Sequence, residues 1–191
     1  TINDGFTLTV GTGIANAINL DAVSGVAANA ASNLTINTTG AVTVAEAVGT
    51  DIGTLTITNS GGTTFSSTVD AVTVTLTNTT GNIQFTDNLT ATTLNTANQA
   101  YAVSLTGTTT SITSDTNFLN TGVVTLGNNG DTLTFAGGLA TASNATNPSS
   151  TSVSGTVRTN GQPMDIGPAT LTSTSTLRTD NTVPAGAAMN F

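Results

Sequence analysis

The chain has 191 residues, of which two are basic (Arg158 and Arg178) and ten are acidic, and its net charge at pH 7 is −8. Nucleic acids and anionic membrane surfaces are bound through clustered lysine and arginine, so this composition argues against both as partners. No apolar run reaches the roughly 18 to 20 residues that span a bilayer, so we expect no membrane insertion.

Short segments of alternating apolar residues follow one another along the chain, separated by Gly, Asn and Asp. The alternation predicts β-strands and the intervening residues predict turns. Threonine, which is β-branched and favours extended backbone, is abundant, whereas strong helix formers are sparse. In chain order, the expected strands are residues 6–10, 17–20, 33–37, 41–45, 54–58, 63–69, 71–77, 82–86, 101–106, 122–126, 131–136, 152–158 and 169–177. The sequence therefore predicts an all-β fold.

One pattern recurs along these strands: Leu-Thr-Ile-x-Asn, or a close variant, followed shortly by Gly. Its copies are residues 34–40, 55–61, 74–81 and 124–130. The first three copies begin 21 and 19 residues apart. A period near 20 residues, with a short strand and a turn in each unit, is typical of stacked coils and predicts a β-solenoid.

The spacing of phenylalanine suggests how each coil is built. Phe65, Phe85 and Phe135 each follow the apolar pair of a repeat by eight or nine residues. We therefore expect two inward-facing strands in each coil and an interior column of phenylalanine. Nine or ten coils, at about 4.8 Å per coil, would make a rod of about 45 Å.

The pattern divides the chain into three parts. Residues 1–139 are expected to form solenoid coils, residues 140–151 a linker or protruding loop, and residues 152–191 further coils and a C-terminal end segment. Arg158 and Arg178 lie one 20-residue period apart. A weak surface salt bridge to Asp165 or Asp180 is favoured over an anion site here. The first residue is Thr and no signal peptide is visible, so we expect a processed protein or an excised piece of a larger one.

The four repeat copies, together with residues 101–107, 123–128 and 132–138, resemble the β-strand repeat regions of large secreted bacterial adhesins of the filamentous-haemagglutinin kind. The resemblance covers about residues 33–139. It implies a right-handed parallel β-helix displayed on the cell surface or secreted. The variable coil length leaves an alternative open, a β-sandwich subunit of a filament or surface layer.

The acidic residues are the only candidates for a metal site. One acid per coil could form a column of carboxylates that a cation such as Ca²⁺ would neutralise. The candidates are Asp51, Asp70, Asp87, Asp115 and Asp131. No Asp-x-Asp or Gly-Gly-x-Gly-x-Asp run occurs, so we favour the interpretation that each Asp caps a turn, and we expect no cofactor.

Catalysis is not expected. Histidine, lysine and cysteine are absent, and no two acids share a local motif, so neither an activated nucleophile nor a carboxylate pair is indicated. We therefore predict a non-enzymatic structural or adhesive domain of an extracellular bacterial surface protein. Its expected partners are adjoining repeats, other copies of the chain, and a host or matrix glycan.

Two alternatives remain. The first is a subunit of a self-assembling filament or surface layer, in which residues 1–10 are donated to a neighbour through Ile2, Phe6, Leu8 and Val10. The second, ranked last, is a carbohydrate-active or an ice-binding β-helix. Thr-x-Thr runs such as residues 54–58 and 73–77 suggest ice binding, but that function needs a flat, regular array and the coil lengths vary.

Overall fold

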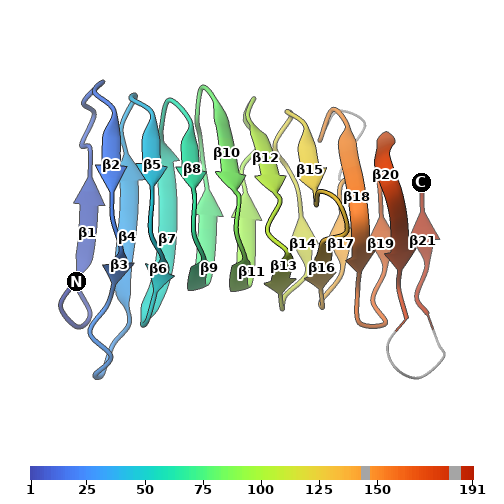
Figure 1. The fold of residues 1–191 in the computed structure, drawn as a ribbon, viewed down its shortest axis with the longest axis horizontal. Helices are drawn as coiled ribbons and strands as arrows, with labels where there is room; N and C mark the ends of the chain where they lie inside the picture. Colours follow the sequence, from blue (N-terminus) through green and yellow to red (C-terminus); the bar gives the residue numbers. More distant parts are fainter. Residues whose placement is uncertain (143–146, 181–185) are drawn as a thin grey trace.

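The computed structural model describes residues 1–142, 147–180 and 186–191, which form a β-solenoid of about eight turns with no helix. Successive coils are about 21 residues apart, and the strands lie side by side along the long axis of the molecule (Figure 1). All strand pairings among the described residues are parallel. The predicted solenoid is thus confirmed, and the alternative of a β-sandwich, which is built from antiparallel sheets, is wrong.

The strands stack on three faces, which we call A, B and C in the order in which the chain visits them. Face A holds β1 (Thr7–Val10), β4 (Ser32–Asn37), β7 (Ile52–Asn59), the second halves of β9 (Val69–Leu76) and β11 (Leu89–Thr96), β14 (Thr116–Asn117), β17 (Leu139–Ala140), β19 (Met164–Asp165) and β21 (Met189–Asn190). Face B holds β2 (Ile18–Leu20), β5 (Val42–Val44), β8 (Thr63–Phe65), β10 (Asn82–Phe85), β12 (Ala102–Leu105), β15 (Val124–Leu126) and the first halves of β18 (Thr151–Arg158) and β20 (Ala169–Arg178). Face C holds β3 (Val23–Ser24), β6 (Val48–Gly49), the first halves of β9 and β11, β13 (Thr109–Ile112), β16 (Thr132–Phe135) and the second halves of β18 and β20.

Some long strands turn a corner: β9 and β11 between faces C and A, and β18 and β20 between faces B and C. In β9, Val69 and Ala71 are buried at the two-residue spacing of a strand, but the next buried residue is Val74, three positions later. The extra residue in the alternation marks the bend. With it, the side chains that follow the bend again point into the interior. The prediction of two inward strands per coil is therefore wrong, since each coil has three.

Inward side chains of successive coils stack in columns on all three faces. On face A, Leu34, Leu55 and Val74 lie in register and are each fully buried. Burying one such side chain stabilises a fold by about 1.5 to 3 kcal/mol, and the column repeats that contribution in every coil. The aliphatic residues of the recurring pattern are thus the core.

The phenylalanines form only part of the predicted column. Phe65 and Phe85 lie in register on face B, with ring centroids 4.8 Å apart and planes inclined by 7°. Phe135 instead lies on face C, where it contacts Phe118 edge to face with centroids 6.3 Å apart. The fourth copy of the pattern, residues 124–130, begins on face B, whereas the first three copies begin on face A. The predicted alignment of the fourth copy with the first three is therefore wrong, because it was based on spacing in the sequence alone.

The coil runs on past residue 140. β17 and the start of β18 belong to neighbouring faces of the stack, and Thr141 and Asn147 are both buried. Residues 143–146, in the middle of the predicted linker or loop, lie outside the described residues, as do residues 181–185 of the C-terminal segment. The strands from β18 to β21 add coils to the same stack.

Tyr101, the single tyrosine of the chain, ties two coils together. It is 2% exposed, and its hydroxyl donates to the carbonyl of Leu76 at 2.6 Å and accepts from the N–H of Ala97 at 2.9 Å. Burial raises the pKa of Tyr101 to about 12, against the opposing effect of the Ala97 N–H. Its neutral form is therefore the form that the fold stabilises.

We predict that replacing Tyr101 by Phe lowers the free energy of unfolding by about 1 to 3 kcal/mol, because both hydrogen bonds of the buried hydroxyl are lost, while the Ala97 N–H and the Leu76 carbonyl keep their 3.0 Å bond to each other. Since the unfolded tyrosine ionises near pH 10, the contribution is complete below that pH and is lost as pH rises toward about 12. Denaturation across this range should show a fall in wild-type stability that the Phe variant lacks. Tyrosinate absorbance of the folded wild type with a midpoint near 10 would contradict the prediction.

Candidate functional site

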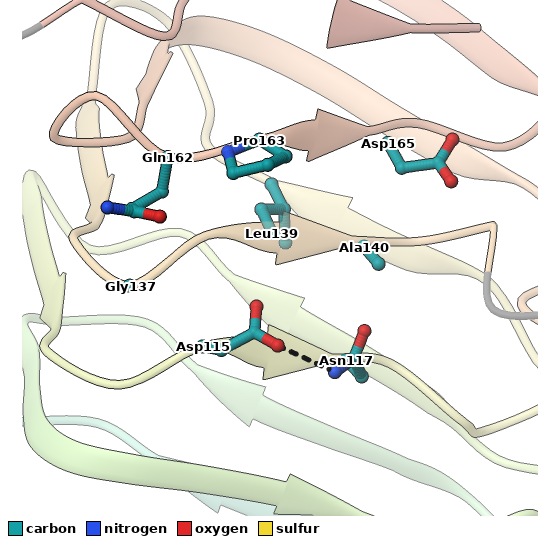
Figure 2. Close-up of a pocket in the computed structure, with 8 residues that line it drawn as sticks. All are labelled: Asp115, Asn117, Gly137, Leu139, Ala140, Gln162, Pro163 and Asp165. Carbon is teal, nitrogen blue, oxygen red and sulfur yellow. Dashed lines mark hydrogen bonds between the residues drawn. The ribbon is translucent and has the colours of Figure 1, made fainter. Parts of the chain in front are cut away.

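An open groove crosses face A near the C-terminal end of the solenoid. It has a volume of about 370 Å³ and is lined by residues of three successive coils. Figure 2 shows Asp115 and Asn117 along one side, Leu139 and Ala140 along the floor, and Gln162, Pro163 and Asp165 along the other side.

Glycine keeps this groove open. Gly138, which precedes β17, has a φ of 121°, and an added Cβ would stand 2.9 Å from the Asp115 carboxylate oxygen and 3.4 Å from the carbonyl of Pro163. A side chain at this position would therefore enter the space between the two sides of the groove. One carboxylate is partly oriented, because the Asn117 amide donates to Asp115 at 3.1 Å.

The groove presents two carboxylates and two primary amides above an apolar floor. Carboxylate oxygens accept, and amides both accept and donate, so the set can hydrogen bond to several hydroxyl groups at once. Among the residues that the structure describes, no aromatic side chain lines the groove, so these residues would hold a sugar ring by hydrogen bonds without stacking. The chemistry suits a neutral polyhydroxylated ligand better than an anion.

The five predicted metal candidates are distributed over different parts of the coil. Asp70 lies on face C and pairs in register with Thr90, so Asp87 is not its neighbour in the stack. Asp115 lies in the groove, whereas Asp131 lies in the turn before β16. Within the described residues, no three acidic side chains come together to hold a metal ion. Calcium binding by these residues stays a prediction.

Several acids bond to nearby backbone instead. Asp131 is 7% exposed and accepts the Asn128 N–H at 2.7 Å, and Asp87 accepts the N–H of Asn88 at 2.7 Å. Both contacts are side-chain to backbone bonds that fix turns, as the capping interpretation expects.

Two further acids lie at corners in the first three coils. Asp4 accepts the N–H groups of Asn29 and Ala30, and these bonds lower its pKa. Asp51 sits at the corner before β7 with a φ of 60°. One of its carboxylate oxygens is buried and makes no hydrogen bond to the described part of the chain.

The two arginines lie one above the other on face C, in β18 and β20. Arg178 forms a bidentate ion pair with Asp180, with bonds of 2.9 and 2.6 Å, and this pairing lowers the pKa of Asp180. Both side chains are exposed, so the pair contributes little to stability. The predicted surface salt bridge to Asp180 is confirmed.

The N-terminal residues named for strand donation pack largely on their own chain. Ile2 is 7% exposed and bridges Gly25 in parallel, while β1 pairs with β4. Val10 is partly buried against the core, whereas Phe6 and Leu8 are exposed, because no coil covers them. The first strand is therefore an edge of the solenoid, and only Phe6 and Leu8 offer apolar surface.

Sequence reasoning named Asp115 but missed its groove partners Asn117, Gln162 and Asp165. Asp165 lies two coils after Asp115, and the coils in between are longer than the 20-residue period, so no regular spacing connects the two. Only the stacking brings them to one groove.

Across the described residues there is no helix of the length and hydrophobicity needed to cross a membrane. No family model, no curated protein and no solved structure matches this chain.

Proposed function

We propose that this chain is a non-enzymatic structural and adhesive domain of a secreted bacterial surface protein. The observation that carries the proposal is the stack formed by the described coils, in which each coil buries its apolar residues on its neighbours. A rod of about eight coils at about 4.8 Å each is about 38 Å long, and it can hold a binding surface away from its point of attachment.

The groove supplies the adhesive part of the proposal. The carboxylates of Asp115 and Asp165 and the amides of Asn117 and Gln162 suit the hydroxyl groups of a host or matrix glycan. An open groove on a rigid face allows a chain-like ligand to lie across several coils. The low content of charged residues leaves such a contact dependent on hydrogen bonds rather than on charge.

A glycan array, followed by mass spectrometry of the bound glycans, tests this function. We expect binding of a subset of glycans that are recovered intact. Replacing Asp115 and Asp165 together by Asn should weaken binding at least tenfold. Replacing Asp70 on face C by Asn makes the same kind of change outside the groove and should leave binding unchanged. Absence of binding to any glycan or matrix protein, or recovery of cleaved glycans, would contradict the proposal.

A second candidate function, self-assembly into filaments, is favoured by the two ends of the stack. Apolar side chains are exposed at both, with Phe6 and Leu8 at the first coil and Leu171 and Phe191 at the last. The ends also differ in charge, because the first coil carries Asp4 and Asp21, whereas in the last coils Arg158 and Arg178 are balanced by Asp165 and Asp180. Such ends could associate head to tail.

Light scattering and negative-stain microscopy over a concentration series test self-assembly. We expect rods that lengthen with concentration and that shorten when Leu171 is replaced by Lys. The control is the same change at Val72, which is 55% exposed at a corner in the middle of the stack. A single monomeric species at every concentration would exclude this function.

A further inference from the structure

The outer surface of face A carries a two-column lattice of polar side chains over the first five coils. Outward residues on β1, β4, β7, β9 and β11 lie in register from coil to coil. The first column is Thr7, Asn33, Thr54, Thr73 and Thr93, and the second is Thr9, Thr35, Thr56, Thr75 and Asn95. Threonine occupies eight of these ten positions, and none is charged.

The lattice is regular although the coils differ in length. Successive members of the second column are 26, 21, 19 and 20 residues apart in sequence, yet each pairs directly with the next. The extra residues lie in the connections between strands. The two register shifts between β4 and β7 fall at Ser32/Asn33 and at Ile36/Asn37. Between them, residues 33–36 pair without a shift, and this stretch contains the lattice residues Asn33 and Thr35. In the sequence, the variation in coil length argues against a regular array. In the structure, it does not disturb the spacing of the lattice residues on these five strands.

Threonine is more frequent in this lattice than on face B, and no charged residue interrupts it. On face B, the central outward column reads Asn19, Thr43, Thr64, Gln84, Ser104, Thr125, Ser152 and Thr170, which is half threonine. On face C, an outward column also holds four threonines in register (Thr109, Thr132, Thr156 and Thr176), but the column beside it includes Asp70, Arg158 and Arg178. Cross-strand threonine pairs stabilise any sheet, but that role alone does not explain why two adjacent threonine-rich columns without charge occur together on face A.

The lattice has the chemistry to order water. Neighbouring strands are about 4.8 Å apart and alternate residues along a strand about 6.7 Å apart, so hydroxyl and methyl groups repeat in two directions. β-Branching restricts threonine to few rotamers, so the groups are held in place before any contact forms. These repeats are close to the oxygen spacings on the faces of hexagonal ice, and each hydroxyl can both donate and accept.

We propose that the threonine lattice of face A binds the surface of ice. The ten side chains would anchor a layer of water in which methyl groups fill the hollows between water molecules and hydroxyl groups hydrogen bond to them. Charged groups, which impose their own hydration shell, are absent from the lattice; Asp51 lies at the corner before β7, and Asp115 and Asp165 lie in the groove. The two surfaces are thus separate along the same face.

Thermal hysteresis and the shape of ice crystals, measured with the whole purified chain, test the proposal. The wild type should lower the freezing point below the melting point, produce faceted crystals and be taken up into a growing ice hemisphere. Replacing Thr56 at the centre of the lattice by Tyr should abolish all three effects, because one bulky ring lifts the surface from the ice.

The matched control is the same substitution of Thr64, which points outward on face B and is not part of the lattice. It should keep wild-type ice activity, and both variants should retain the wild-type circular dichroism and melting temperature. Absence of hysteresis and of uptake into ice in the wild type would overturn the proposal, as would equal loss of activity in the two variants. Neither result would affect glycan binding in the groove.

Discussion

Replacing Gly127 by Ala is expected to lower the free energy of unfolding by about 2 to 5 kcal/mol. Gly127 directly follows β15 and has a φ of 80°, where a side chain costs about 1 to 2 kcal/mol. An added Cβ would also stand 2.2 Å from the carbonyl oxygen of Ser154 in the next coil. Because that neighbour is backbone, relief requires the coils to separate, and such overpacking costs about 1 to 3 kcal/mol.

Gly130 provides the matched control for this experiment. It lies three residues further along the same turn with a φ of 101°, but nothing stands within 4 Å of the position of its Cβ. Replacing Gly130 by Ala should therefore cost only the conformational strain, about 1 to 2 kcal/mol. Equilibrium unfolding in denaturant measures both changes, and equal values would show that the close approach of the coils does not constrain Gly127.

Replacing Phe85 by Ala is expected to cost about 3 to 5 kcal/mol, since it removes a fully packed ring from the interior. Phe85 is 1% exposed and stacks on Phe65 of the preceding coil. A double-mutant cycle with Phe65 should give a coupling energy of about 0.5 to 1.5 kcal/mol for the ring pair.

The same substitution at Phe6 is the control, because that ring is 66% exposed at the N-terminal end. Its effect on the free energy of unfolding should stay within about 0.5 kcal/mol. A cost at Phe85 as small as the cost at Phe6 would mean that the stacked rings do not contribute to the core.

The missed strands show where local pattern fails. The sequence predicts no strand over β11 or β13, yet both lie in the stack. Their inward positions include Ala91, Thr96 and Thr110 among larger apolar residues. Small and hydroxylated side chains can face inward when neighbouring coils enclose them, and this weakens the alternation on which sequence reading depends.

The sequence by itself determined that the chain is all-β, that its coils are about 20 residues long, and that the aliphatic residues of the recurring pattern are buried. These properties follow from side-chain period and turn residues, which act over a few neighbouring positions. The tertiary structure alone decided that each coil has three faces, that Phe135 lies apart from Phe65 and Phe85, and that Asp115 and Asp165 share a groove. The lengths of the connections vary, so the alignment of one coil on the next is fixed by packing and backbone hydrogen bonds and not by distance along the chain.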